Sequence, residues 1–95
     1  MELSEFQDTI RRTFLHRDTD RGLDGTFRWM VEEVGELAKS FRRGDHAELT
    51  HEVGDVLAWL ASVANVAGVD LEEAAGRYGH GCPTCGAIPC RCPLA

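Results

Sequence analysis

Residues 27–68 decide the fold, and they read FRWMVEEVGELAKSFRRGDHAELTHEVGDVLAWLASVANVAG. Apolar side chains recur along this stretch at steps of three and four residues, which is the period of an amphipathic helix. Gly44 and Gly68 stand where a left-handed residue would end each of two helices, and Asp45 stands where a side chain would cap the second. The stretch therefore predicts two helices joined by a short connection, which makes them antiparallel neighbours.

Shorter helices are predicted on either side of this pair. Ser4 and Gln7 have the spacing of a capping box, so a first helix is expected over about residues 4–16. The polar residues 17–25 predict a loop. A short helix after the pair is expected to end near Tyr78. No alternating β pattern appears, so the predicted class is all-α, with about four helices per chain.

Composition limits the classes of function. The 95 residues suffice for one small domain, and the net charge of -6 argues against duplex nucleic acid as a partner, because phosphate backbones require Lys and Arg surfaces. No apolar run approaches the roughly 18 residues of a membrane span. Residues 1–20 are polar and charged, so no secretory signal peptide is expected. We expect a cytoplasmic protein without a membrane partner.

Two acidic clusters are the main functional signal. Glu32, Glu33 and Glu36 lie in the first helix of the pair, and Glu52 and Asp55 lie in the second. Like charges three or four residues apart on a helix repel by a few tenths of a kcal/mol, so the clusters call for a polyvalent cation. A hard divalent ion such as Mg²⁺ takes oxygen ligands and retains affinity for phosphates. The ordinary alternative is a solvated acidic face.

Helical geometry indicates which way these acids point. The first helix of the pair has an apolar side, predicted to face the core, that carries Phe27, Val34 and Phe41. The opposite stripe carries Trp29, Glu33, Glu36 and Ser40. On the second helix Glu52 falls inside an apolar arc and Asp55 at its edge. Antiparallel packing would bring the acids of the two helices face to face.

The double motif resembles that of a known family. Glu32-Glu33-Val34-Gly35-Glu36-Leu37 followed by Glu52-Val53-Gly54-Asp55-Val56-Leu57 is similar to the signature of the MazG-like all-α nucleotide pyrophosphohydrolases, and the resemblance covers roughly residues 24–78. It implies a Mg²⁺-dependent enzyme that converts a nucleoside triphosphate to a monophosphate and pyrophosphate. It also implies a helical bundle completed by oligomerisation, as a homodimer or homotetramer.

Carried over residue by residue, the resemblance implies a set of magnesium ligands and a general base. The ligands are Glu33, Glu36, Glu52 and Asp55, with Glu32 as an auxiliary. Glu33 or Glu36 is expected to accept the proton of the attacking water, and the sequence does not choose between them.

Three further residues are candidates for substrate binding. Trp59 lies four residues after Asp55 and could stack on a base, although a core or interface role is equally consistent with its position. Lys39 and Arg77 are candidate phosphate ligands. Many family members have an Asn and a Pro near the position of Arg77, and residues 75–79 of this chain contain neither. No role is assigned to His51 or to the other histidines.

The C-terminal tail contains a second constellation. Its thiols have the spacing C-x₂-C-x₄-C-x-C and comprise Cys82, Cys85, Cys90 and Cys92. Four soft ligands without a neighbouring catalytic base suit a structural Zn²⁺ site. An iron–sulfur centre or a single iron is the main alternative, and two disulfides are disfavoured in a reducing compartment. The chain is therefore divided into a helical domain, residues 1–79, and a zinc-binding tail, residues 80–95.

Two classes of function remain open on the sequence. The first is the hydrolase, with a role in cleaning the nucleotide pool and with phosphoribosyl-ATP as a related substrate. The second is an adaptor or nucleotide sensor that binds metal without turnover. The broad apolar arc of the second helix of the pair exceeds what one neighbouring helix covers, so a homo-oligomer is expected in either case.

Overall fold

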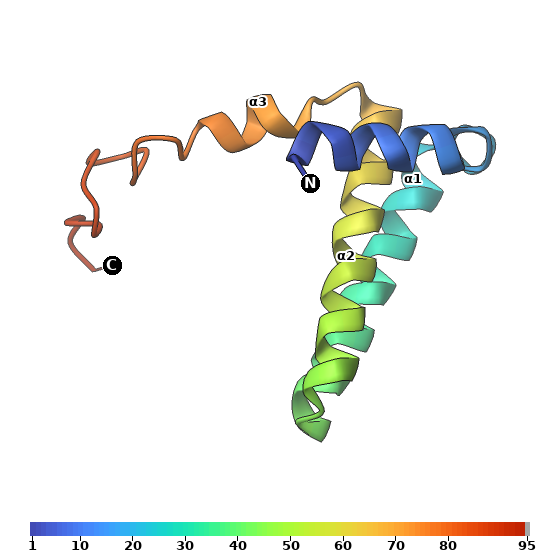
Figure 1. Cartoon of the computed structure of the whole chain (residues 1–95), viewed down its shortest axis with the longest axis horizontal. Coiled ribbons are helices and arrows are strands. Elements are labelled where there is room, and N and C mark those ends of the chain that lie inside the picture. Colours follow the sequence, from blue (N-terminus) through green and yellow to red (C-terminus); the bar gives the residue numbers. More distant parts are fainter. Residues whose placement is uncertain (95) are drawn as a thin grey trace.

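The computed structural model describes residues 1–94, which contain three helices and no strand. These are α1 (Leu3–Arg43), α2 (His46–Ala67) and α3 (Leu71–Gly76), followed by an irregular tail. Figure 1 shows α1 and α2 side by side as an antiparallel pair, with α3 and the tail leading away from one end of it. The predicted all-α class is confirmed. None of the helices in the described range is both long and apolar enough to span a membrane.

A sharp bend at Gly22 divides α1 into an N-terminal limb, residues 3–21, and a C-terminal limb, residues 23–43 (Figure 1). Gly22 has φ 87° and ψ 168°, a conformation that costs little only for glycine. Apart from this residue the helix continues through residues 17–25, so the loop predicted there was wrong. Thr26 Oγ1 donates a 2.7 Å hydrogen bond to the Gly22 carbonyl, so a polar residue supports the bend instead of facing solvent.

The helix ends of the central pair follow the predicted pattern. Gly44 and Gly68 have φ values of 70° and 73°, and each ends its helix in the left-handed conformation. Asp45 caps α2 by accepting hydrogen bonds from the N–H groups of Ala47 and Glu48. Asp70 caps α3 in the same manner. These local signals fix where α2 and α3 begin, and hence which residues of α2 can face α1.

The N-terminal limb of α1 is tied to the rest of the chain by Gln7. The predicted capping box with Ser4 does not form, because α1 begins at Leu3, after an N-cap Glu2 that makes no side-chain bond. Gln7 is instead buried, and its amide bonds to three groups at the end of α2 and the start of α3: Asn65 Oδ1, the Val69 carbonyl and the Leu71 N–H. This bonding holds the N-terminal limb across the end of the pair.

The side of α1 that packs against α2 is not the side that the sequence predicts. Phe27, Val34 and Phe41, expected in the core, are 48%, 47% and 67% exposed. Thr26 and Ser40 are fully buried instead, and the apolar core is small, comprising Ile10, Ala61, Ala64 and Leu71. The pattern correctly marks an amphipathic helix, but it does not say whether the apolar side meets the same chain or another one.

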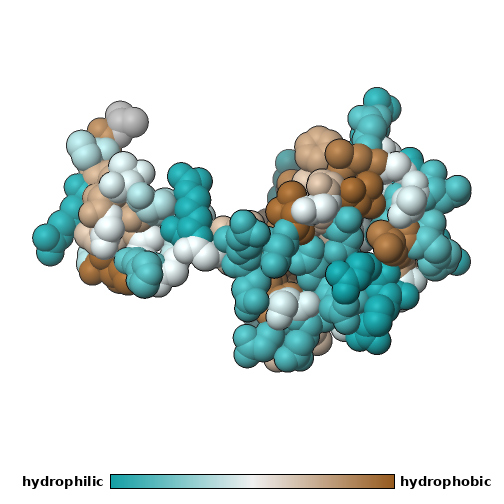
Figure 2. All heavy atoms as spheres, turned by 90° about the horizontal axis from the view of Figure 1, so that it is seen from above, coloured by the Kyte–Doolittle hydropathy of each residue, from teal (hydrophilic) through white to brown (hydrophobic). Residues whose placement is uncertain are grey.

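The single chain consequently leaves large apolar side chains in water. Val53, Leu57 and Leu60 of α2 are also 39–50% exposed, and Figure 2 shows apolar side chains at the surface of the helical body. The radius of gyration is 15.6 Å, against the about 13 Å expected for a compact domain of this length. The exposed side chains describe a helical body that does not enclose its own hydrophobic surface, and the radius of gyration reflects an extended chain whose tail leads away from the helical pair.

Candidate functional site

Of the five acidic residues predicted as metal ligands, four lie close enough to the fifth, Glu33, to affect its carboxyl group. Partial burial raises the pKa of the Glu33 carboxyl above its usual 4.5, and four neighbouring negative charges raise it further. In decreasing order of effect, these charges belong to Asp55, Glu52, Glu36 and Glu32. Glu33 is therefore the carboxylate on which the electrostatic repulsion of both helices converges.

Glu52 is the member of the cluster with a buried, unpaired carboxylate oxygen. Its Oε2 is buried and has no hydrogen-bond partner in the described part of the chain. Leaving such an oxygen unpaired is costly, because burial removes the water that would otherwise solvate it. Carboxylate oxygens are the ligands preferred by Mg²⁺, so this donor set fits a hard divalent cation.

His51 joins the cluster, although sequence reasoning assigned it no role. Its Nε2 lies 3.3 Å from Asp55 Oδ2, and one ligand atom from each of His51, Glu52 and Asp55 fits within 4.8 Å of the others. The available signal was the spacing His51-x-x-x-Asp55, which places two side chains on the same face of a helix. Imidazole adds a nitrogen donor beside the carboxylates.

The two tryptophans of the chain form a stacked pair next to the acids. The ring centroids of Trp29 and Trp59 are 6.1 Å apart, with an angle of 16° between the planes. The Arg21 guanidinium carbon lies 4.9 Å from the centroid of the Trp59 ring. Trp59 also lines a pocket of about 290 Å³ that includes Asp55 and residues of the N-terminal limb of α1. An aromatic surface therefore lies beside the acidic cluster.

Of the predicted phosphate ligands, the chain brings one to the cluster. Lys39 Nζ lies 3.4 Å from Glu36 Oε1. Arg77 follows α3, stacks over Tyr78 at 5.5 Å, and lines a separate pocket together with Asp70. The structure thus places Lys39 with the acids and Arg77 apart from them.

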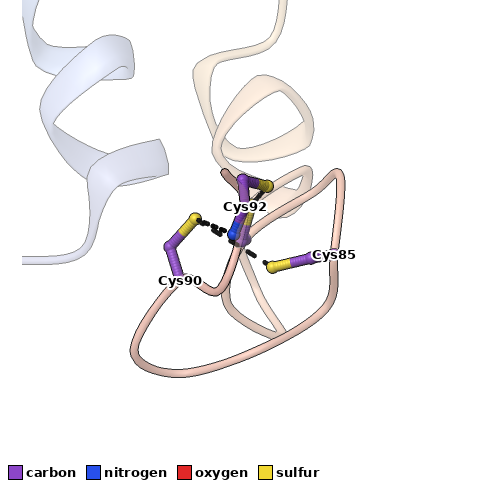
Figure 3. Close-up of side chains that lie close together, drawn as sticks. Cys85, Cys90 and Cys92 are labelled. Carbon is purple, nitrogen blue, oxygen red and sulfur yellow. Dashed lines mark hydrogen bonds between the residues drawn. The ribbon is translucent and has the colours of Figure 1, made fainter. Parts of the chain in front are cut away.

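The four cysteines of the tail converge on one point. All four are free thiols, and their sulfur atoms lie within 4.8 Å of one another. The sulfurs of Cys82 and Cys92 are 3.7 Å apart, and those of Cys85 and Cys90 are 4.0 Å apart. Four sulfurs bound tetrahedrally to zinc at ~2.3 Å would be about 3.8 Å apart. Figure 3 shows the side chains of Cys85, Cys90 and Cys92 turned toward the same space.

Backbone N–H groups support negative charge on these sulfurs. Donation from Cys85 and Thr84 lowers the pKa of the Cys82 thiol to about 6, and donation from Arg91 over 3.3 Å lowers the pKa of the Cys85 thiol. The neighbouring sulfurs, of which Cys90 has the largest effect, raise the pKa of the Cys92 thiol to about 11. Metals bind the thiolate form, so the spacing of the four sulfurs and the lowered pKa of the Cys82 and Cys85 thiols suit a soft-metal site.

Comparison with known families gives one match. The model of the MazG nucleotide pyrophosphohydrolase domain matches residues 21–80, which is more than half of the chain. The matched range contains both acidic clusters and both tryptophans, and it excludes the four cysteines. A comparison with curated proteins found no match.

Replacing Glu33 with Gln is expected to stabilise the metal-free protein near pH 7 but not near pH 4. Folding raises the pKa of Glu33, so the protonated carboxyl contributes to stability at pH values below the pKa of the unfolded chain. This contribution is lost as the pH rises through the raised pKa of the folded state. Glutamine cannot lose a proton, so the variant escapes this loss. The measurement is the difference in Tm between variant and wild type in EDTA across this pH range.

The matched control is Glu5→Gln, which changes an exposed glutamate at the start of α1. It should give no gain that grows with pH. A Glu33→Gln variant whose Tm difference stays flat, or shrinks, as the pH rises would contradict the crowding of charge at Glu33.

Proposed function

This chain belongs to the MazG nucleotide pyrophosphohydrolase domain family, and from that premise we propose that it hydrolyses nucleoside triphosphates to a nucleoside monophosphate and pyrophosphate. The observation that carries the proposal is the acidic cluster across the α1–α2 pair, where partial burial and four neighbouring carboxylates raise the pKa of Glu33. A triphosphate substrate is itself highly charged, so a cluster that recruits divalent cations suits it.

The proposed cation is Mg²⁺, held by Glu33, Glu36, Glu52 and Asp55 with Glu32 as an auxiliary. The buried Glu52 Oε2, which lacks a partner among residues 1–94, supports this assignment. Bound magnesium supplies neutralisation of phosphate charge and a lower pKa for a coordinated water. The carboxylates of the chain fix where that charge lies, and their mutual repulsion favours the loaded state.

Among the two candidates for the general base, we favour Glu33. A base works best when its pKa lies near the working pH, and the pKa of Glu33 is raised toward neutrality. Glu36 Oε1 instead lies 3.4 Å from Lys39 Nζ, in an exposed ion pair. Lys39 is proposed to contact a phosphate oxygen, and Trp59 to stack on the base.

For the tail, residues 80–95, we propose a structural Zn²⁺ site separate from the helical domain, residues 1–79. Support comes from the convergence of the four sulfurs and from the lowered pKa of the Cys82 and Cys85 thiols. Four thiolates fill a tetrahedral site, so no position remains for substrate. Free thiols also suit the reducing cytoplasm, which is our proposed location.

We further propose that the active form is a homodimer or homotetramer. The exposed apolar side chains of α1 and α2 lie on the faces that the two helices do not turn toward each other. Burying apolar area stabilises association by roughly 25 cal/mol per Å², so a second copy is the natural cover for this surface.

Glu36→Gln and Asp55→Asn are each expected to reduce pyrophosphate release by about a hundred-fold or more, as when a group that stabilises transition-state charge is removed. The assay follows pyrophosphate from a panel of canonical and modified nucleotides, including phosphoribosyl-ATP, with Mg²⁺. Glu73→Gln, on α3 outside the cluster, is the control that should retain turnover. Binding of nucleotides without any turnover would favour the sensor, and undiminished turnover in both variants would reject the ligands.

Cys85→Ser is expected to lose the tail metal while retaining most of the hydrolase activity, because the thiolates lie outside the acidic cluster. Metal content by elemental analysis should fall from about one zinc per chain toward zero. Thr84→Ala, next to Cys85, should retain the zinc. A visible absorption spectrum of the purified protein would reveal iron and overturn the zinc assignment.

Val34→Glu is expected to convert the oligomer to monomers, since it places a charge in the exposed apolar side of α1. Molar mass from light scattering measures the change. Thr13→Glu alters an exposed polar residue of the N-terminal limb and should leave the mass unchanged. A wild-type protein of monomer mass would contradict the proposed assembly directly.

A further inference from the structure

We propose that Asp18 selects the nucleobase, by accepting a hydrogen bond from an exocyclic amino group in the pocket beside the acidic cluster. The site would then favour bases that carry an amino group, such as cytosine and adenine, over partners with a carbonyl at the same position, such as uracil and hypoxanthine. The inference rests on the proposed function and deepens it, because it names the substrate class of the same site.

The pocket lies next to the acidic cluster and has aromatic side chains in its wall, so it offers a place for the phosphates and a place for the base of one nucleotide. It encloses about 290 Å³ between the N-terminal limb of α1 and the middle of α2. Asp55 of the acidic cluster contributes to its wall, and so do Trp59 and Phe14. A nucleotide whose phosphates lie at the acids can therefore place its base in this pocket, against aromatic side chains.

Asp18 is the buried polar group of this pocket that needs a partner. Asp18 is one of the residues that line the pocket, and it is 2% exposed. One carboxylate oxygen, Oδ1, accepts a 2.9 Å hydrogen bond from Arg21. The other, Oδ2, is buried and unpaired within residues 1–94. Because an unpaired buried carboxylate oxygen is costly, a donor supplied by the bound base would recover the missing interaction.

The surroundings of Asp18 hold it in place. Arg21 offsets its charge and fixes its orientation, and the same guanidinium lies over the Trp59 ring at 4.9 Å. Thr26 Oγ1, on the other side of the Gly22 bend, lies 3.4 Å from Arg21 Nη1. The Arg21 guanidinium thus contacts the Asp18 carboxylate and the Trp59 indole at the same time.

Trp59 and Asp18 contribute differently to recognition of the base. Stacking on Trp59 gives affinity for any base, since every base has a π face. An ionised carboxylate is acceptor-only, so it attracts an amino group and repels a carbonyl oxygen. Selectivity between a base with an amino group and its carbonyl counterpart therefore belongs to Asp18.

The test compares substrates that differ at that one position. We expect the kcat/KM of the wild type to be roughly ten-fold or more higher for dCTP than for dUTP, the ratio that one hydrogen bond to a charged group provides. ATP and ITP form the matching purine pair. Asp18→Asn should bring the dCTP/dUTP ratio close to one, mainly by slowing dCTP. Asp8→Asn, an exposed ion-paired carboxylate on the same limb, should keep the wild-type ratio.

A binding measurement separates this inference from the proposed hydrolysis. Both tryptophans of the chain belong to the stacked pair, so intrinsic fluorescence reports on this pocket. Titration with dCMP and dUMP needs no turnover, and the wild type should bind dCMP the more tightly by a similar factor. If no triphosphate is hydrolysed, the proposed function fails, and this titration alone decides the role of Asp18.

Equal affinities of the wild type for dCMP and dUMP would overturn the inference. An unchanged dCTP/dUTP ratio of kcat/KM in Asp18→Asn would also overturn it, because water or a second copy of the chain would then be the hydrogen-bond donor to Oδ2. If circular dichroism shows that Asp18→Asn does not fold, Asp18→Glu keeps the charge and shifts the oxygens. Asp18→Glu should lower the dCTP/dUTP ratio of kcat/KM, and an unchanged ratio in this variant would count against the proposal.

Discussion

The repulsion among carboxylates held across the α1–α2 pair is the constraint on which the rest of the structure depends. Each helix alone could turn its acids toward water, where like charges cost little. Packing the helices together limits that option for Glu33, which is partly buried, and buries one carboxylate oxygen of Glu52. The close approach is possible because the contact surfaces carry small residues such as Ser40 and Ala61, both fully buried. The pair is therefore built around a charge that the polypeptide does not neutralise by itself.

Using the contact surface for acids has a consequence for the opposite side of each helix. Large apolar residues cannot occupy the same surface, so Phe27, Val34 and Phe41 lie outside it and remain exposed in the single chain. An amphipathic helix with its apolar side outward is stable only when another surface covers that side. In this chain, the proximity of the acidic residues and the exposure of the large apolar side chains thus both follow from which sides of α1 and α2 pack together.

Much of this could be predicted from the sequence, because the signals are local. Gly44, Asp45 and Gly68 act through their own backbone and hydrogen bonds, so the ends of the central pair were predictable, as was the proximity of the two acidic clusters. Residues 17–25 were misassigned because polar residues such as Asp18 look like loop residues, and only the structure reveals that Asp18 is buried beside the bend. The burial of Gln7 and the pairing of Trp29 with Trp59 also depend on contacts between segments distant in sequence.

The two proposed metal sites are distinguished by the chemistry of their ligands. The acidic cluster presents hard oxygens, which suit Mg²⁺, whereas the tail presents four sulfurs, which suit Zn²⁺. The tail follows α3 without regular secondary structure in residues 82–94, and its convergence depends on the sulfurs and a few backbone bonds. Such a segment has too little apolar surface to fold by burial, so metal binding would supply its folding free energy. In the helical pair the proposed cation would act differently, because the fold there does not depend on it and bound positive charge would relieve the repulsion at Glu33.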